Sequence, residues 1–376
     1  MIKTIEIEGF KSLEKVRLEL GGLNLFIGAN ASGKSNFFDA LRVLQGIGYG
    51  FTVDEIFNGK PKGASSEVWE GIRGGSSRAA FVRRGREQDG GHIRLAISLQ
   101  WPHSDVYYEA VLSLIHSPCF RSESMRAGDI DWKRTAGVGE SVFSELRDAL
   151  KDDAQQAVLS VLLTLGDVQA VEPDPSILRQ YSSSQAARSL GERGENFAAL
   201  VKSILGQEDL RSAYLSWLRQ LTPMEFDDAT ILEGALGEPL FALQEGNETF
   251  PAPILSDGTL RFAAITAAFF QPDMPGIITI EEIENGIHPS RLRLLLELLK
   301  SQTRGTGPQV FATTHSPVVL AWLDEEDYKT TFRCRRDAES GASIITPLSE
   351  IPHLIDLVRK QPIGELFTEG WLEGAF

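Results

Sequence analysis

The stretch Gly28-Ala-Asn-Ala-Ser-Gly33-Lys34-Ser35 decides how this chain is interpreted. It matches the pattern G-x-x-x-x-G-K-[ST], in which backbone N–H groups surround a phosphate. The lysine brings positive charge to the β- and γ-phosphate oxygens, and the serine hydroxyl ligates Mg²⁺. Residues 23–27 before it form a short apolar run, and apolar residues after it recur at helical spacing. This strand–loop–helix context predicts a nucleotide phosphate site.

A second motif lies near residue 280, where Ile277-Ile-Thr-Ile runs into Glu281 and Glu282. The first acid of such a pair can hold Mg²⁺ through water, and the second can orient or deprotonate an attacking water molecule. A buried strand that ends in acids at the surface is also common for structural reasons. Alone, this motif therefore leaves both interpretations open.

Two further segments are ordinary when each is taken alone. Leu255-Ser-Asp-Gly-Thr-Leu-Arg261 precedes a predicted helix, and Ser256 is a favourable helix-capping residue. Thr313-Thr-His-Ser-Pro317 follows a predicted buried strand, and a single histidine such as His315 can be purely structural. The information lies in the order of the four motifs along the chain.

The composition is that of a folded protein rather than a disordered one. The chain has 376 residues, 42% hydrophobic and 24% charged, and its net charge is −15. Cys119 and Cys334 are the two cysteines, so neither a disulfide framework nor a cysteine-based zinc site can form within one chain. The apolar runs are too short to cross a bilayer, and no apolar signal region precedes the first strand pattern. We expect a cytoplasmic protein with no membrane partner.

The charge is unevenly distributed. Residues 221–260 contain eight acids and no Lys or Arg. Residues 73–94 contain six arginines: Arg73, Arg78, Arg83, Arg84, Arg86 and Arg94. The net charge argues against nonspecific coating of nucleic acid, whereas a local basic patch remains compatible with DNA. Solvated arginines that pair with acids elsewhere are an equally good interpretation.

Hydrophobic periodicity divides the chain into three parts. Residues 1–116 alternate between strand patterns and one helix, and residues 250–376 combine buried strands with helices. The intervening residues 117–249 show mainly helical periodicity. The segments with the clearest patterns are strands at 78–83, 93–100, 106–114, 276–280 and 309–314 and helices at 142–165, 196–221, 260–270 and 290–300. The expected fold is α/β with a mostly helical insertion.

In their order, the motifs resemble the ATPase heads of ABC-type proteins, in the branch that contains RecF, SMC and OLD proteins. The resemblance covers roughly residues 1–116 and 250–325. Besides the segments already quoted, its matches are Gly9-Phe-Lys-Ser-Leu13, Asn36, Asp39-Ala-Leu41 and Glu281-Glu-Ile-Glu-Asn-Gly-Ile-His-Pro289. The resemblance implies an ABC-ATPase head, with a phosphate-loop mixed sheet and an antiparallel β lobe, around residues 117–249 as an insertion.

The resemblance also implies roles for particular residues. ATP would be bound by the phosphate loop, namely Gly28, Asn30, Gly33, Lys34, Ser35 and Asn36. Ser35 would ligate Mg²⁺, and Glu281 would hold the ion through water. Glu282 would be the catalytic carboxylate, and His315 would contact the γ-phosphate. Ser256 and Gly258 would contact the γ-phosphate bound to the opposite protomer, and Asn285 and Gly286 would link the two sites. These roles require a homodimer that forms on ATP.

Three residues depart from the usual pattern of the superfamily. Glu281 stands in place of Asp, Ile283 in place of Pro, and Asp257 in place of the first signature Gly. We expect an active ATPase with slow turnover. The glutamine that completes the Mg²⁺ ligands is not evident, and Gln100, at the end of the 93–100 strand, is the candidate.

Three functions are compatible with this resemblance. The first is the motor or sensor of a DNA-transaction or anti-phage defence system. About 60 residues follow His315, too few for the TOPRIM nuclease of OLD proteins, so we expect a separate effector such as a nuclease. The second is a transporter motor, which the inserted residues and the lack of an adenine-stacking Tyr before Gly28 disfavour. The third is an ATP-dependent sensor with little turnover. The apolar residues of 363–376 favour a helix on the chain's own core over a docking element.

Overall fold

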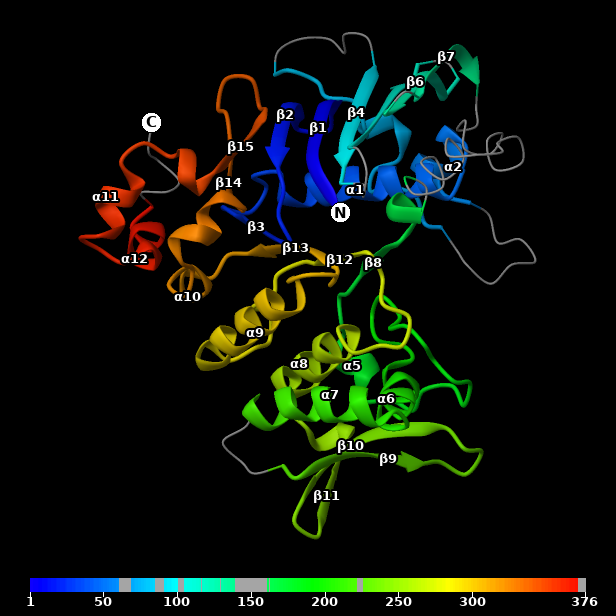
Figure 1. Ribbon diagram of the computed structural model, residues 1–376, viewed down its shortest axis with the longest axis vertical. Coiled ribbons are helices and arrows are strands. Elements are labelled where there is room, and N and C mark those ends of the chain that lie inside the picture. Colours follow the sequence, from blue (N-terminus) through cyan, green and yellow to red (C-terminus); the bar gives the residue numbers. More distant parts are fainter. Residues whose placement is uncertain are drawn as a thin grey trace. The chain divides into compact units, whose positions relative to one another are not determined.

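The computed structural model describes residues 1–60, 69–84, 91–100, 105–115, 117–128, 130–138, 161, 163–221 and 226–370. The chain forms two compact units, whose elements are labelled in Figure 1. The first unit comprises Met1–Val168, Asp324–Gln361 and Glu369–Phe376. The second unit comprises Gln169–Leu323 and Pro362–Thr368. The sequence motifs are shared between them, with the phosphate loop in the first and the others in the second.

An antiparallel six-stranded sheet makes up much of the first unit. Its order is β2-β1-β4-β5-β6-β7, with β1 (Ile2–Phe10), β2 (Leu13–Glu19), β4 (His92–Leu99), β5 (Val106–Ser113), β6 (Cys119–Ala127) and β7 (Ile130–Val138). Along β5, buried and half-buried residues alternate strictly. This alternation is expected of a sheet with one covered and one polar face.

The phosphate loop follows β3, a short strand in a second set of strands of the first unit. β3 (Leu23–Ile27) pairs in parallel with β14 (Thr331–Arg336), which pairs antiparallel with β15 (Ser343–Pro347). Phe26 of β3 stacks against Phe37 of α1 (Lys34–Gly48) at 4.4 Å and against Phe332 at 5.0 Å. Each such aromatic pair contributes about 1 kcal/mol beyond burial. These contacts fix the strand and the helix on either side of the loop.

The other elements in the described part of the first unit are short. They are α2 (Val53–Asn58), the 3₁₀ turns η1 (Ser76–Arg78), η3 (Glu325–Lys329) and η4 (Leu348–Glu350), and α11 (Leu354–Val358). A capping box at Thr52 and Glu55 begins α2.

The second unit combines buried parallel strands with helices. β12 (Ile277–Ile280) pairs in parallel with β13 (Gln309–Thr314), and every residue of both strands is buried. The helices are α5 (Pro175–Leu178), α6 (Phe197–Leu205), α7 (Glu208–Leu221), α8 (Asp257–Ala268), α9 (Pro289–Gln302), α10 (Pro317–Leu320) and α12 (Ile363–Thr368). Continuously apolar strands of this kind are typical of a sheet covered on both faces.

A separate three-stranded sheet belongs to the second unit, in the order β11-β10-β9. Its strands are β9 (Asp228–Glu233), β10 (Pro239–Glu245) and β11 (Glu248–Pro251), the last followed by the 3₁₀ turn η2 (Ala252–Ile254). Phe241 of β10 packs on Phe197 of α6 at 4.8 Å. One further strand, β8 (Val168–Ala170), lies where the two units meet in sequence.

The α/β class predicted from the motifs is confirmed. Among the described residues of 117–249, the expectation of a mostly helical segment is wrong. β6 and β7 belong to the antiparallel sheet of the first unit, and β9 to β11 form a sheet of their own. The expected boundary at residue 116 therefore falls between two paired strands, β5 and β6. A unit boundary lies instead at Val168.

Most other predicted elements agree with the structure. The 309–314 strand is β13, the 290–300 helix is α9, and the 196–221 segment forms α6 and α7. The expected strand at 78–83 is wrong, since η1 ends at Arg78 and a single bridge joins Ala80 to Phe10. Most of the predicted helix at 142–165 lies outside the described residues, as does the chain after residue 370.

Of the helix predicted within residues 363–376, the described part is α12, which packs on α10. A Cβ atom on Gly364 would lie 2.5 Å from the carbonyl oxygen of Pro317, so this contact is close. Within the described residues, no helix is both long enough and apolar enough to cross a membrane.

Candidate functional site

The phosphate loop of the first unit has an unusual backbone. Gly28, Ala31 and Gly33 all have positive φ, at 145°, 62° and 108°. A Cβ atom on Gly33 would lie 2.0 Å from Ser343 Oγ, so no other residue fits there without movement. Residues with left-handed backbone turn successive N–H groups inward, which creates a concave binding site for anions. The loop leads directly into α1, whose N-terminus favours negative charge.

Lys34, the first residue of α1, is 6% exposed. Its ammonium group donates to the carbonyl oxygens of Gly28 at 2.7 Å and Ala29 at 2.9 Å. Both acceptors belong to the loop itself, so the charge of Lys34 lies inside the concave turn. Ser35, the next residue, is half-buried, and Asn30 on the loop is exposed.

A chain of side-chain hydroxyls fixes the loop from behind. Ser343 Oγ of β15 donates to the carbonyl oxygen of Ser32 at 2.7 Å and lies 2.6 Å from Ser12 Oγ. Ser12, in the turn between β1 and β2, also accepts from the Asn36 side-chain amide at 2.6 Å. Two segments distant in sequence, those of Ser12 and Ser343, therefore support the loop together with Asn36 of α1. Sequence reasoning gave no role to Ser343, whose segment carries no recognisable motif.

A buried carboxylate ties α1 to two cations. Asp39, 5% exposed, accepts from Lys11 Nζ at 2.5 Å and from Arg73 Nε at 3.1 Å. Arg73 also donates to the carbonyl oxygen of Ser35 at 3.0 Å. The match of Gly9–Leu13 and Asp39 to the family thus has a physical basis, because Lys11 contacts Asp39 and Ser12 contacts Asn36, on one face of the helix that follows the loop.

The donor set fits a phosphate with a partly hydrated cation. Within the described residues, no group of three or more His, Cys, Asp or Glu side chains gathers as a metal cage. Mg²⁺ at nucleotide sites keeps several waters and takes one or two protein ligands together with phosphate oxygens. The Ser35 hydroxyl beside the loop suits such a site.

Gln100 does not belong to this group. It follows β4, is exposed, and its backbone N–H donates to the carbonyl oxygen of Met1 at 3.0 Å. Met1 precedes β1, whereas Ser12, which contacts the loop, follows the other end of β1. A nine-residue strand spans about 30 Å at about 3.3 Å per residue. Gln100 as an Mg²⁺ ligand is therefore a wrong prediction for this structure.

In the second unit, Ser256 caps α8. Its hydroxyl accepts from the Thr259 backbone N–H at 3.2 Å and lies 2.8 Å from the Thr259 hydroxyl. Ser256 is exposed, and its neighbour Asp257 pairs with Arg179 at 2.5 Å. A Cβ atom on Gly258 would lie 2.6 Å from the carbonyl oxygen of Gly286. This glycine therefore lets α8 approach the Asn285-Gly286 turn.

Glu281 and Glu282 follow β12, as the sequence predicts. Glu281 is half-buried and Glu282 is exposed, with φ at +50°. A residue with a side chain pays about 1–2 kcal/mol for such a backbone, which persists where its surroundings impose it. The Glu282 N–H donates to the Thr313 hydroxyl of β13 at 2.8 Å. This contact places the two acids beside the strand that leads to His315.

His315 is held by the same turn. Its backbone N–H donates to Glu284 Oε1 at 2.5 Å, and its side chain is half-exposed. Glu284 therefore joins the turn after β12 to the end of β13. Within the second unit, the structure brings together Ser256, Gly258, Glu281, Glu282 and His315 through α8 and these two strands.

Arg261 of α8 has a role that the sequence did not indicate. Its side chain is 8% exposed and donates to the carbonyl oxygens of Glu281 and Glu282, each at 3.3 Å. Burial lowers the pKa of its guanidinium group, partly offset by Glu172, Glu282 and Glu284. Arg261, Thr313 and Glu284 all lie inside quoted motifs. Their roles depend on contacts between strands and helices that no spacing reveals.

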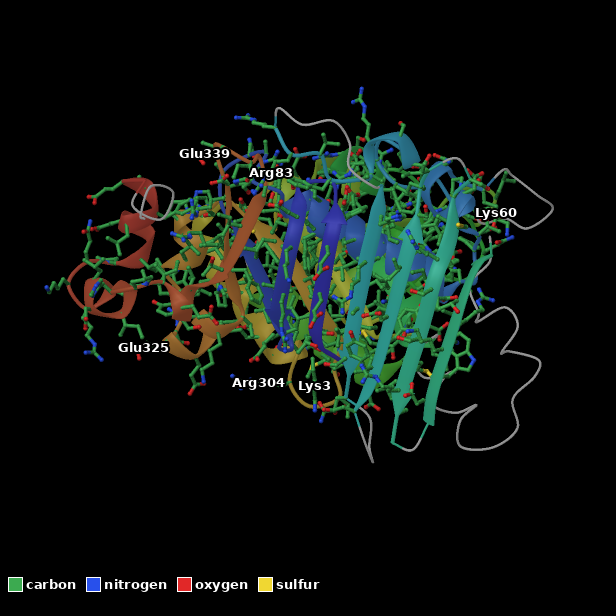
Figure 2. The ribbon with its side chains drawn as sticks, turned by 90° about the horizontal axis from the view of Figure 1, so that it is seen from above. Lys3, Lys60, Arg83, Arg304, Glu325 and Glu339 are labelled. Atoms are coloured by element: carbon green, nitrogen blue, oxygen red, sulfur yellow. The ribbon has the colours of Figure 1, made fainter. Side chains whose placement is uncertain are left out.

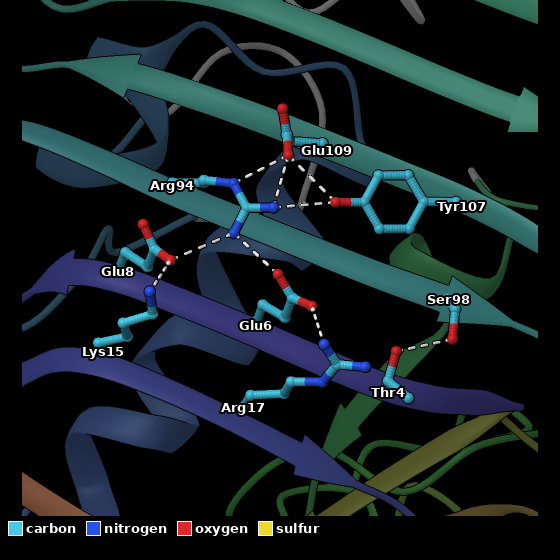
Figure 3. A network of polar contacts seen from close by, with 9 residues as sticks. All are labelled: Thr4, Glu6, Glu8, Lys15, Arg17, Arg94, Ser98, Tyr107 and Glu109. Atoms are coloured by element: carbon cyan, nitrogen blue, oxygen red, sulfur yellow. Dashed lines mark hydrogen bonds and ion pairs between the residues drawn. The ribbon is translucent and has the colours of Figure 1, made fainter.

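The arginines of residues 73–94 do not form one patch. Arg73 is bonded to Asp39, and Arg94 lies in an acidic cluster, where it donates to Glu6 and Glu109 at 2.9 and 2.8 Å (Figure 3). Burial acts to lower the pKa of Arg94, but the bonds to Glu6 and Glu109 outweigh it and raise it.

Arg78, Arg83 and Arg84 are exposed, and Arg86 lies outside the described residues. Figure 2 shows Arg83 beside the loop that carries Glu339. The neighbouring Arg84 donates through its backbone N–H to the carbonyl oxygen of Ser340 at 3.0 Å. The candidate basic surface is thus smaller than the sequence suggested.

Comparison with known protein families gives matches in two separate parts of the chain. A family model described as "AAA ATPase domain" matches residues 1–58. A second, described as "AAA domain, putative AbiEii toxin, Type IV TA system", matches residues 225–321. The first match contains the phosphate loop, and the second contains Ser256, both acids and His315.

Two curated proteins are similar over short segments. An "ATP/GTP phosphatase" of Helicobacter pylori (strain ATCC 700392 / 26695) is 38% identical over 82 residues, which are 21% of this chain and 22% of that protein. The "Chromosome partition protein Smc" of Desulfitobacterium hafniense (strain Y51) is 55% identical over 47 residues, 12% of this chain and 4% of that protein. The chain therefore spans only a small part of the length of these relatives.

Solved structures are similar over almost the whole chain. The SMC head bound to the C-terminal winged-helix domain of ScpA has a TM-score of 0.58 at 15% identity, over 93% of this chain and 99% of that one. The Pyrococcus furiosus SMC head with an extended coiled coil, bound to the C-terminal domain of ScpA, has a TM-score of 0.55 at 14% identity, over 95% and 99%. At these identities the likeness shows the fold alone, and it confirms the head fold predicted from the motifs.

Proposed function

The chain is an ABC-type ATPase head of the RecF/SMC/OLD kind. We propose that this chain binds ATP together with Mg²⁺, hydrolyses the ATP and forms a dimer when ATP is bound. The observation that carries this proposal is the phosphate loop. The loop combines left-handed residues, a buried lysine and a serine hydroxyl that hydrogen-bonds to it from behind. Such preorganisation suits a site that must stabilise phosphate charge.

Binding of the nucleotide is the task of the first unit. Backbone N–H groups of the loop and the Lys34 ammonium would hold the β- and γ-phosphates, with Asn30 on the loop and Asn36 directly after it. Ser35 would ligate Mg²⁺, which neutralises phosphate charge when bound. The family resemblance assigns Glu281 the role of holding the ion through water.

Hydrolysis is the task of the turn after β12. Glu282 would orient and deprotonate the attacking water, and His315 would contact the γ-phosphate. Ser256 and Gly258 would meet the nucleotide of a second copy, which makes each site complete only in a dimer. The exposed position of Ser256 at the start of α8 supports this role.

The test of nucleotide binding is Lys34→Ala. We expect its ATP affinity to fall at least about 100-fold, because the loop loses its charge at the β- and γ-phosphates. Lys60→Ala is the matched control, since the side chain of Lys60 is 46% exposed and pairs with Glu55. Fluorescent ATP titration checks both variants. Unchanged affinity in Lys34→Ala would overturn the assignment of the loop.

An ATP-dependent switch with little turnover is the second candidate. Glu281 has a longer side chain than the Asp usual at this position, and this departure favours slow hydrolysis. Steady-state hydrolysis with and without duplex DNA separates the two candidates. Steady turnover that duplex DNA stimulates supports a motor, and turnover near zero with intact dimerisation supports a switch.

The physiological setting that we propose is a DNA transaction or anti-phage defence, with a separate effector such as a nuclease. The family model for residues 225–321 names a putative toxin of a toxin–antitoxin system, which supports a defence role. The solved SMC heads bind ScpA, which supports recruitment of a partner protein by this fold. Co-purification of this chain, in the presence of ATP, with a nuclease encoded by a neighbouring gene would test this proposal.

A further inference from the structure

The backbone of Glu282 is fixed by three separate residues. Its N–H donates to the Thr313 hydroxyl at 2.8 Å, and its carbonyl oxygen accepts from Arg261 at 3.3 Å and from the Asn285 N–H at 2.9 Å. Both polar groups of the peptide backbone at this residue are thus engaged. A left-handed conformation at a non-glycine residue relaxes unless its surroundings hold it.

The three contacts come from different elements. Asn285 lies in the same turn as Glu282 and would move with it. Thr313 belongs to β13 and is 1% exposed, and Arg261 belongs to α8 and is 8% exposed. Two rigid, buried elements therefore determine the conformation of the turn, and the turn alone does not.

The hydrogen bonds of Arg261 show that it holds the backbone of several residues in position. Its guanidinium group donates to the carbonyl oxygens of Pro173, Glu281 and Glu282, all at 3.3 Å. None of these acceptors is a carboxylate, although Glu172, Glu282 and Glu284 act on its charge. A buried cation that donates its hydrogen bonds to backbone carbonyl oxygens fixes the position of the backbone. A cation that paired with carboxylates would instead neutralise their charge.

We propose that Thr313 and Arg261 are positioning residues that impose the left-handed backbone of Glu282 and so aim its carboxylate, with Arg261 acting from the helix that Ser256 caps. This inference rests on the proposed function, because it concerns the carboxylate that activates water. The inference adds that α8 and the turn after β12, which carries Glu282, move together. A shift of α8 displaces the carbonyl oxygen of Glu282 directly.

The sharpest test replaces the Thr313 hydroxyl without changing its shape. Thr313→Val keeps the volume of the side chain and removes the acceptor of the Glu282 N–H, whereas Thr313→Ser keeps the acceptor. We expect Thr313→Val to lower kcat about 10- to 100-fold while KM for ATP changes less than about 2-fold. We expect Thr313→Ser to keep kcat within about 3-fold of the wild type.

A matched control separates positioning from stability. Thr266 is fully buried on α8, and among the described residues its hydroxyl has no hydrogen-bond partner. Thr266→Val should leave kcat unchanged. Arg261→Lys should reproduce the loss of kcat, because a single ammonium group cannot span both carbonyl oxygens of the turn. Combined with Thr313→Val, it should cost less than the sum of the two effects, since both act on one turn.

The outcomes distinguish this inference from the proposed function. Glu282→Gln that hydrolyses ATP at the wild-type rate would overturn the proposed function. If Glu282→Gln is inactive and folded Thr313→Val keeps full kcat, the positioning role is overturned and the function stands. A rise in KM without loss of kcat would also overturn it. Where Thr313→Val fails to fold by thermal denaturation, the same kcat and KM criteria apply to Arg261→Lys.

Discussion

Ser256 shows how one hydroxyl can serve both the fold and the site. It caps α8 through the Thr259 N–H, and it is exposed where the family resemblance would place a second copy's nucleotide. Capping tolerates any side-chain acceptor, including a carboxylate. Contact with a γ-phosphate does not, because a carboxylate repels it. The two roles can therefore be separated by substitution.

We predict that Ser256→Asp keeps the thermal unfolding midpoint at or above that of the wild type, because Asp caps helices well and its charge suits a helix N-terminus. The same variant should lose ATP-dependent dimerisation. Ser256→Thr should keep both properties. Thermal denaturation and sedimentation velocity with ATP check the pair. A dimer of Ser256→Asp as tight as the wild type would show that Ser256 does not meet phosphate.

Single residues also mark the limit of sequence reasoning. Lys34, Glu282 and His315 were located by motif, since their chemistry depends on residue type at fixed spacing. Gln100 was misassigned because its distance from the loop depends on the register of β1 with β4. Arg261 and Thr313 were quoted without a role, because a hydrogen bond to a backbone carbonyl or N–H leaves no pattern in a sequence.

Among the elements, β14 connects the phosphate loop to the C-terminal part of the first unit. It pairs with β3 on one side and with β15 on the other. A Cβ atom on Gly28 would lie 2.1 Å from the carbonyl oxygen of Cys334, so the loop packs directly on this strand. Burial raises the pKa of the Cys334 thiol to about 12. Cys334 is therefore a probe of whether the strand under the loop is intact.

We predict that Cys334 resists a thiol reagent at pH 8 in the folded protein, while the partly exposed Cys119 reacts. Nucleotide should slow labelling of Cys334 further, since binding stabilises the loop that covers it. Between about pH 9 and 12 the unfolded thiol ionises while the folded thiol stays protonated, so this group lowers stability as pH rises. Mass spectrometry after timed labelling measures the rates. Equal rates for both cysteines would show that β14 opens readily.

Elements differed in how well their sequences predicted them. β12, β13 and α9 were correct because their apolar patterns are long and unambiguous. β6 contains Arg-Ser-Glu-Ser-Met-Arg, a polar run that becomes a strand through pairing with β5 and β7. Helical periodicity was therefore overestimated in residues 117–249. Strands whose stability comes from their neighbours are poorly visible to a local pattern.

At the scale of the whole molecule, the charge distribution bears on DNA as a partner. Of the arginines in residues 73–94, Arg73 and Arg94 are engaged with buried or clustered acids. Arg83 and Arg84 are exposed; Arg83 lies 3.7 Å from Glu14, and Arg84 donates to the Ala338 carbonyl oxygen. These contacts are weak enough to exchange for phosphate, because exposed pairs contribute about 1 kcal/mol or less.

If DNA is the partner, the triple replacement of Arg83, Arg84 and Arg86 by Glu should abolish weak duplex binding and leave basal hydrolysis intact. The salt dependence of binding should also flatten, by a slope of about 2–3, because up to three phosphate contacts are lost. Arg304→Glu, an exposed arginine of the second unit, is the control. Fluorescence anisotropy across a salt series measures both. Unaltered affinity in the triple variant would show that this surface does not bind DNA.

Sedimentation velocity of Glu282→Gln with Mg²⁺ and ATP tests whether Glu282 drives ATP hydrolysis in a dimer of this chain. The variant should bind ATP normally and hydrolyse it at least about 100-fold more slowly, because water loses its base. The retained γ-phosphate should then hold it as a stable dimer, whereas the variant without nucleotide stays a monomer. A Glu282→Gln protein that remains monomeric at saturating ATP, or that hydrolyses ATP at the wild-type rate, would contradict the account.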